Sequence, residues 1–323
     1  MRSIILIMVL ITATLTGCGV VKDTEVPSGA FPGEYYQVTD DKGNVLEFNK
    51  KPTRIYATTL SIEEILVDLV PLNRIVAISE PAADTKISLI ADKAAHISVK
   101  LPQKASTEKI LSLKPDLVIV QENSNAAFIQ SLKDVGLKVY ITKVPTTVKM
   151  VRSRIINLAA AVGEKQQGGK IINELDNKTE TVKKVIGQIP KSEKKNLMAY
   201  SLLGVFGSAE GLFHDICISA GVTNGVALAG LVRGEHLSKE KIVEVDPDIL
   251  MFSDYSSTQE GDSELFRKEV LDDPALQSIK AIKNKNIIII KDRYRYAASQ
   301  YIGDAICDIA QKTYPEYFDQ INN

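Results

Sequence analysis

The sequence has no tryptophan, few cysteines and histidines, and almost no net charge, and each scarcity excludes a class of protein. Three cysteines in 323 residues cannot form the disulfide framework of a small secreted domain. Three Cys and three His also leave too few ligands for a Cys/His-rich metal cluster, so we expect no metal site. Lys and Arg total 39 against 40 Asp and Glu, so the chain lacks the basic excess that proteins use to bind nucleic acid.

Common cofactor motifs are missing as well. The chain contains no GxGxxG, and the nearest approach to a P-loop, at 163–170, places its Lys one position late. We therefore expect no cofactor. The composition, with 45% apolar and 24% charged residues, is typical of a globular protein. The length of 323 residues predicts two domains.

The N-terminus reads as an export signal. Arg2 precedes an apolar stretch at 4–11, which is shorter than the roughly 20 residues of a membrane span. It ends in Leu-Thr-Gly-Cys at 15–18, which resembles the bacterial lipobox, in which the Cys receives a diacylglyceryl group. We predict a signal peptide at 1–17, lipidation of Cys18 and a flexible tether at 18–36, with the membrane reached through the lipid alone. An ordinary signal peptide that happens to contain a Cys is the alternative.

Beyond residue 37, segments with strand and helix spacing alternate, which is typical of parallel βαβ units. Gly43-Asn44 predicts the turn of a hairpin at 38–48. Strands are expected at 54–58, 74–78, 117–120 and 138–142, and again at 197–201, 249–252 and 287–290. Helices are expected near 61–69, 128–135, 211–220 and 297–312. Between the two sets lies a helical stretch, 148–186, which breaks at Gly163. We predict an α/β fold with mainly parallel sheets: an N-terminal lobe at 37–163, a connecting helix at 164–187 and a C-terminal lobe at 188–323.

A fifteen-residue segment occurs twice, once in each lobe. Residues 106–120 and 238–252 are identical at six positions, and each reads as a Ser N-cap, a short helix with Glu in its first turn, Pro-Asp and a buried strand. Gene duplication and convergence would both produce this repeat.

Several segments together resemble a substrate-binding lipoprotein of an ABC importer, of the class that delivers iron–siderophore complexes, haem or cobalamin. They are 108–119, Arg54-Ile55, 64–66 and 219–226. The resemblance implies two Rossmann-like lobes, one long rigid connecting helix, and a ligand cleft between the lobes. It also implies a monomer outside the cytoplasmic membrane whose partners are a permease and its ATPase. Within these segments, we expect Glu64 to be structural.

The family also assigns a role to the repeated Glu. One acidic residue on each lobe docks onto Arg residues of the permease, and the matching positions are Glu108 and Glu240. A carboxylate in the first turn of a helix is favoured by the helix dipole, and two such groups would orient the complex.

Ligands of open α/β sheets lie beyond the carboxyl ends of the strands, which nominates the loops after each strand. The concentrated cationic and aromatic stretch at 291–296 belongs to this set. The residues that we expect to bind the ligand are Ser61, Ser79, Glu122, Arg233, His236, Tyr255, Arg293, Tyr294, Arg295 and Tyr296.

The chemistry of this set favours an anionic iron(III)–siderophore. Arg provides bidentate donors for carboxylate or catecholate oxygens, whereas cobalamin would need more aromatic surface than the 6% that this chain contains. Haem with its propionates also fits, with His236 as an axial ligand or as a hydrogen-bonded surface residue. Cobalamin and haem therefore stay as alternatives.

Two further questions stay open in the sequence. Cys217 and Cys307 could form a disulfide or remain two separate thiols.

A two-lobe hydrolase is the alternative from a different class, but no GxSxG is present and three His offer few general bases, so we expect no enzyme activity. A purely structural lipoprotein would need no cleft between lobes.

Overall fold

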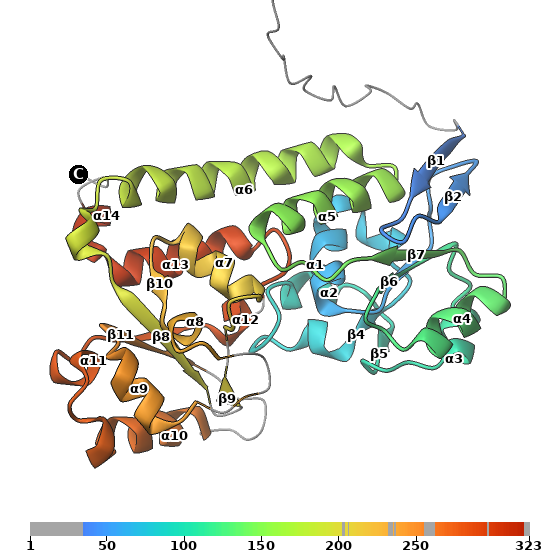
Figure 1. Ribbon diagram of the computed structural model, residues 1–323. Helices are drawn as coiled ribbons and strands as arrows, with labels where there is room; N and C mark the ends of the chain where they lie inside the picture. The colour runs from blue at the N-terminus through green and yellow to red at the C-terminus, as the bar shows by residue number, and fades with distance from the viewer. Residues whose placement is uncertain are drawn as a thin grey trace, which may run out of the picture.

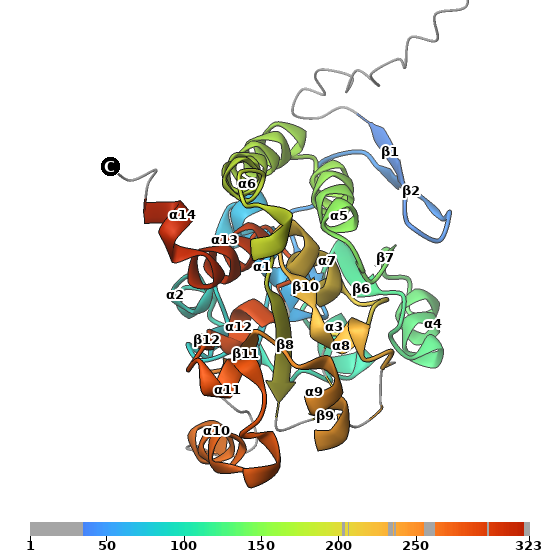
Figure 2. The same ribbon diagram turned by 60° about the vertical axis from the view of Figure 1, so that its left-hand side comes forward.

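The computed structural model describes residues 35–201, 204–205, 207–231, 235, 237–254, 262–295 and 297–319. Two α/β lobes lie side by side, and the long helix α6 (Lys165–Ile186) runs along one side of both (Figure 1). Figure 2 shows the same arrangement after a turn of the molecule. Among these residues, no helix combines the length and the apolar character that crossing a membrane requires.

The N-terminal lobe begins with an antiparallel hairpin and continues with a parallel sheet of order β3-β6-β7. A short parallel pair, β4 and β5, extends the lobe, and a single bridge between Ile55 and Ile75 links the two parts. The strands are β1 (Tyr36–Thr39), β2 (Val45–Phe48), β3 (Ile55–Ala57), β4 (Ile78–Ser79), β5 (Lys100–Leu101), β6 (Leu117–Gln121) and β7 (Val139–Thr142). The helices are α1 (Leu60–Leu69), α2 (Ala91–Ala95), α3 (Thr107–Ser112), α4 (Ala126–Asp134) and α5 (Val148–Ala161), with 3₁₀ turns at Leu72–Arg74 and Glu80–Ala83.

The C-terminal lobe repeats this plan with a parallel sheet of order β10-β8-β11-β12, to which β9 adds antiparallel to β8. The strands are β8 (Asn196–Ser201), β9 (Gly204–Val205), β10 (Thr223–Asn224), β11 (Ile249–Ser253) and β12 (Ile287–Ile290). The helices are α7 (Leu212–Ser219), α8 (Gly225–Leu228), α9 (Lys239–Val245), α10 (Asp262–Asp272), α11 (Lys280–Lys283), α12 (Asp292–Arg295), α13 (Ile302–Thr313) and α14 (Pro315–Asp319), with 3₁₀ turns at Lys191–Glu193 and Pro274–Leu276.

These two lobes, their mainly parallel sheets and the connecting helix confirm the fold class predicted from the sequence. The hairpin turn at Gly43 has the expected positive φ of 86°, and Gly163, with φ of 75°, separates α5 from α6. The limits 37–163, 164–187 and 188–323 stay a prediction, although α6 lies within the middle range.

Two expected elements were wrong in extent. The apolar run at 74–78 gives only the two-residue strand β4, because the 3₁₀ turn ends at Arg74 and Ile75 contributes a single bridge. The C-terminal helix begins at Ile302 rather than near 297, because residues 298–301 bind the other lobe instead of continuing a helix.

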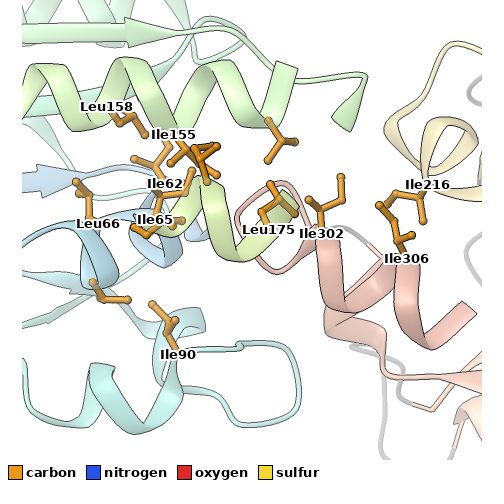
Figure 3. Packing of buried hydrophobic residues seen from close by; sticks show 14 of the residues in the cluster. Ile62, Ile65, Leu66, Ile90, Ile155, Leu158, Leu175, Ile216, Ile302 and Ile306 are labelled. Atoms are coloured by element: carbon orange, nitrogen blue, oxygen red, sulfur yellow. The ribbon is translucent and has the colours of Figure 1, made fainter. Parts of the chain in front are cut away.

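The central strands of the two larger parallel sheets are covered on both faces, as their uniformly apolar sequences predicted. Separate clusters fill the outer faces, one around β6 and β7 and one around β8 and β11. A third cluster is continuous from one lobe to the other. It runs from Ile62 and Leu66 on α1 through Leu175 on α6 to Ile302 and Ile306 on α13 (Figure 3). The lobes therefore share an apolar core.

Helix α6 packs closely at both ends of this shared core. A Cβ atom added at Gly168 would lie 2.4 Å from the Ala159 Cβ on α5, and one added at Gly303 on α13 would lie 2.9 Å from the Leu175 Cδ1. Interiors of this density resist deformation, which makes the connection between the lobes stiff.

Candidate functional site

The predicted ligand residues of the N-terminal lobe follow its strands, but they differ in how far they are free to bind. Ser61 lies at the start of α1, where its Oγ accepts a hydrogen bond of 3.2 Å from the Nη1 of Arg154. Ser79 is only 3% exposed, and its N–H and hydroxyl both donate to the Glu63 carboxylate at 2.6 Å, so this conformation does not offer it to a ligand. Glu122 forms an ion pair of 2.8 Å with Lys42, which is the main reason that its pKa is lowered.

Three nominated residues of the 291–296 stretch lie in the described part of the chain, and they have different partners. Arg293 donates across to the N-terminal lobe, from its Nη1 to the carbonyl oxygens of Thr85 and Ser88, both at 3.4 Å. Tyr294 is partly buried, burial raises the pKa of its hydroxyl, and the Lys291 ammonium lies 5.6 Å from its ring centre. Arg295 is 9% exposed and pairs with the Asp292 carboxylate at 2.8 Å, so it stabilises α12 within its own lobe.

The remaining predicted residues lie outside the described part of the chain. These are Cys18, Arg233, His236, Tyr255 and Tyr296, together with the predicted signal peptide and the tether up to residue 34. Their roles stay predictions.

Arg154 is a buried cation that the sequence analysis did not identify. It lies on α5, is 2% exposed, and donates to the Lys143 carbonyl at 2.5 Å as well as to Ser61. Burial lowers the pKa of its guanidinium to about 10, while the charges of Asp41 and Glu122 oppose the shift, so it stays charged at neutral pH. A signal was present, because Arg154 falls on the same helical face as Val151, Ile155 and Leu158.

Glu108 and Glu240, the predicted docking residues, occupy equivalent and exposed positions. In each helix the capping Ser, Ser106 or Ser238, accepts a hydrogen bond of 3.3 Å from the backbone N–H three residues later. The pKa of each Glu is lowered by hydrogen bonds from its own backbone N–H and from the capping hydroxyl. Both carboxylates are therefore ionised and fixed at the first turn of their helices.

Helices α3 and α9, which we call the paired helices, lie on the side of the molecule away from α6, one in each lobe (Figure 1). An exposed aliphatic side chain follows each Glu one turn later, at Leu111 with 40% exposure and Val243 with 38%. Around Glu240 and Val243 the surface forms a shallow depression of about 380 Å³. Each paired helix thus presents a charge beside a small apolar surface.

Cys217 and Cys307 are free thiols, so the disulfide considered for them is not formed. Cys217 is fully buried in the shared core, whereas the Cys307 Sγ lies 3.9 Å from the Lys178 carbonyl on α6.

Within the described ranges, no group of three or more His, Cys, Asp or Glu is arranged to hold a metal ion. A depression of about 480 Å³ on the C-terminal lobe lies among α7, β10 and α8. None of the nominated ligand residues that the structure describes lines it.

Comparison with known proteins identifies the family. A model of the family described as "Periplasmic binding protein" matches residues 55–294. An uncharacterised ABC transporter substrate-binding lipoprotein, YvrC of Bacillus subtilis, is 21% identical over 97% of both chains. The Fe(3+)-citrate-binding protein YfmC of the same organism is 21% identical over 88% of this chain and 87% of its own. The fold is similar to that of the periplasmic heme-binding protein RhuT from Roseiflexus, with a TM-score of 0.69 and 22% identity over 82% of this chain and 98% of that one.

The family match covers most of the chain, and it spans α6 and the greater part of both lobes. The protein is therefore a solute-binding component of an ABC importer and not an enzyme, and it belongs to the periplasmic binding protein family.

Proposed function

We propose that this protein is an extracytoplasmic, lipid-anchored binding protein that captures an iron(III)–siderophore complex between its lobes and delivers it to an ABC permease. Glu108 and Glu240 are its docking residues, and the permease acts together with its ATPase. The observation that carries the docking proposal is the equivalence of two ionised, exposed carboxylates on the paired helices, one in each lobe.

A permease surface with two separated cations matches this arrangement. Charged groups at the edge of an interface mainly set the rate and the orientation of association. Leu111 and Val243 add apolar contact one turn from each charge. Docking through both lobes at once lets the permease act on their relative position.

The charge of the nominated residues supports an anionic ligand. Arg293 and Tyr294 follow β12, and the buried Arg154 adds a positive charge behind Ser61. Relatives named for ferric citrate and for ferric anguibactin agree with a ferric complex. Haem and cobalamin are the alternative ligands, and a binding assay with a panel of ligands distinguishes them.

The lipid anchor is proposed from the sequence 15–18. A diacylglyceryl group at Cys18 would hold the protein stably at the membrane surface, because two acyl chains bury many methylene groups. Changing Cys18→Ser should therefore release the protein from membrane fractions without altering its affinity for its ligand.

A panel of ligands tests the proposed function directly. The purified protein is dialysed against ferrioxamine B, ferric enterobactin, ferric citrate, haemin and cyanocobalamin, and the bound ligand is quantified by visible absorption. We expect saturable 1:1 binding of a ferric siderophore and weaker binding of haemin and cyanocobalamin. Binding of haemin or cyanocobalamin alone would replace the ligand proposal, and binding of none would contradict it.

Docking is tested with the double variant Glu108→Ala, Glu240→Ala. Uptake of the bound complex by cells that contain the cognate transporter should fall about tenfold or more, with ligand affinity unchanged. Glu244→Ala is the control, because Glu244 is an exposed carboxylate on α9 that pairs with Lys241. A large loss of affinity in the double variant would refute this division of roles.

A further inference from the structure

The stretch that follows the nominated ligand residues of the C-terminal lobe is bound to the N-terminal lobe. Ser299 is fully buried, and its hydroxyl donates to the Glu64 Oε2 at 2.6 Å. The Gln300 Nε2 donates to the Glu64 carbonyl at 2.6 Å and to the Asp68 Oδ2 at 2.7 Å. The Tyr301 hydroxyl adds a bond of 3.3 Å to the same Asp68 oxygen. Three consecutive residues of one lobe are thus held by one face of α1 in the other.

Arg154, on α5, also binds the 298–301 stretch. Its Nη1 donates to the Ala298 carbonyl at 3.4 Å and to the Ser61 Oγ at 3.2 Å. Among the described residues its hydrogen-bond partners are hydroxyl and carbonyl oxygens rather than carboxylates, and its Nε has no partner. Burying a guanidinium costs free energy of desolvation. Stabilisation alone therefore does not explain why Arg154 lies where the two lobes meet.

These contacts form a polar clamp inside an apolar core. We define the junction clamp as Glu64, Asp68 and Arg154 together with residues 298–301. Glu64 is 4% exposed and lies beside Ile62, Ile65 and Leu66, which belong to the shared core. Apolar contacts tolerate sliding, whereas buried hydrogen bonds fix one geometry, since an unpaired partner costs about 1–3 kcal/mol.

The clamp is linked closely to the nominated ligand residues. Tyr294 and Ala298 are separated by three residues, and the Ala297 N–H donates to the Tyr294 carbonyl at 3.3 Å. At its other end, α12 is fixed to the C-terminal sheet, because Asp292 accepts from the Ser253 hydroxyl at 2.6 Å and its N–H donates to Asp254. Helix α12 therefore connects the sheet of one lobe to the clamp on the other.

We infer that Glu64 and Arg154 are positioning residues, which set the place of residues 291–295 relative to Ser61 without touching the ligand. This inference rests on the proposed function, in which both segments face the bound complex. Release of the ligand then has a physical requirement. A permease that separates the lobes has to break the hydrogen bonds of the junction clamp.

The test compares two neighbouring carboxylates on α1. Glu64→Leu removes the acceptor for Ser299, which joins the lobes. Glu63→Leu removes the acceptor for Ser79, which lies within one lobe at the same distance of 2.6 Å. Glu64→Gln keeps an oxygen acceptor and serves as the conservative rescue. Ser299→Ala removes the donor alone and replaces Glu64→Leu should that variant fail to fold.

The readout is hydrogen exchange of the ligand-free protein. Glu64→Leu, or Ser299→Ala, should accelerate exchange in 291–301 about tenfold, with Glu64→Gln close to the wild type. Glu63→Leu should accelerate exchange near 78–83 and leave 291–301 unchanged. Equal acceleration of 291–301 by the Glu63 and Glu64 variants, or none in either Glu64→Leu or Ser299→Ala, would overturn the inference.

Affinity for ferrioxamine B provides the second readout. We expect a loss of about tenfold in Glu64→Leu and less than threefold in Glu64→Gln. If the wild type binds no member of the ligand panel, the proposed function fails, whereas the exchange comparison still decides the role of the clamp. If it binds and Glu64→Leu binds equally well despite faster exchange, the positioning role is refuted.

Discussion

The two lobes are built alike at the paired helices and differ where they meet. Lys114 and Asp246 occupy the same position of the repeat, directly before Pro, and both have left-handed backbone geometry, with φ of 49° and 45°. Glu108 and Glu240 are both exposed, and hydrogen bonds from the backbone N–H and the capping Ser lower the pKa of each. At the junction, by contrast, Glu64 and residues 298–301 have no counterpart in the repeat. The surface that occurs once in each lobe suits a partner that contacts both lobes. The junction occurs only once, and it determines how the two lobes are held together.

The similarity of the two lobes extends to the start of each central strand. The Asp116 carboxylate accepts hydrogen bonds from the N–H groups of Thr53 and Arg54, just before β3. The equivalent Asp248 accepts one from the Asn196 N–H at the start of β8. The Pro-Asp of the repeat therefore has a structural role in addition to ending the helix, because its Asp holds the neighbouring strand in register.

The largest expected effect concerns the two adjacent buried carboxylates of α1, Glu63 and Glu64. Burial raises the pKa of Glu63 and of Glu64 to about 7. Because these two groups bind protons more tightly in the folded state than in the unfolded state, their contribution to stability should be largest below pH 4.5 and should be lost as the pH rises through 7. Each group accounts for about 3 kcal/mol over this window. Denaturant unfolding at pH 5 and pH 8 measures the change.

Glu64→Gln isolates one of these groups. The variant should lose about half of the pH dependence that Glu63 and Glu64 produce together, since it keeps the hydrogen bond and loses the titration. The other ionisable groups near Glu64 are Asp68, Lys93, Tyr301 and Glu63, and all are retained in the variant. An unchanged slope in Glu64→Gln would show that Glu64 does not titrate in this range.

The stiffness of the connection predicts the next effect. Gly168→Val should cost about 2 kcal/mol, because the new side chain meets the Ala159 Cβ and forces α5 and α6 apart. Gly169→Val is the matched control in the same helix, where nothing lies within 4 Å of the added Cβ. The melting temperature should fall by several degrees only in the first variant. Similar losses in both would mean that the helices are not closely packed there.

A smaller difference separates the two Asp residues of the repeat. Asp116→Ala should cost about 2 kcal/mol, since it leaves two backbone N–H groups and the Thr53 hydroxyl without their acceptor. Asp248→Ala removes one such backbone bond and should cost about 1 kcal/mol. Urea unfolding of the two variants measures the order, and the reverse order would contradict it.

The smallest effect belongs to the aliphatic residues of the paired helices. Leu111→Ser and Val243→Ser should each lower uptake by about two- to fivefold, which corresponds to less than 1 kcal/mol of apolar contact with the permease. Folding and ligand affinity should stay at the wild-type level, because both side chains are about 40% exposed. Normal uptake in the two variants would limit the docking contact to the carboxylates.

The repeat and the alternation of strands and helices predicted the fold because both depend on local sequence. Apolar spacing along 148–186 located α5 and α6 within two residues of their ends. The junction clamp could not be predicted in this way. Ser299 and Glu64 are 235 residues apart, and periodicity shows which face is buried but not which polar groups meet there. A Glu-Glu pair inside an apolar helix and an Arg on an apolar stripe were its only local signs.

Hydrogen exchange with and without a bound ferric complex tests the central claim most directly. The wild-type protein is measured alone and saturated with ferrioxamine B, and in parallel with ferric citrate and haemin. Ligand held between the lobes should slow exchange in both 58–62 and 291–301, which belong to different lobes. Protection confined to one lobe, or none with any of the three compounds, would contradict capture of an iron complex between the lobes.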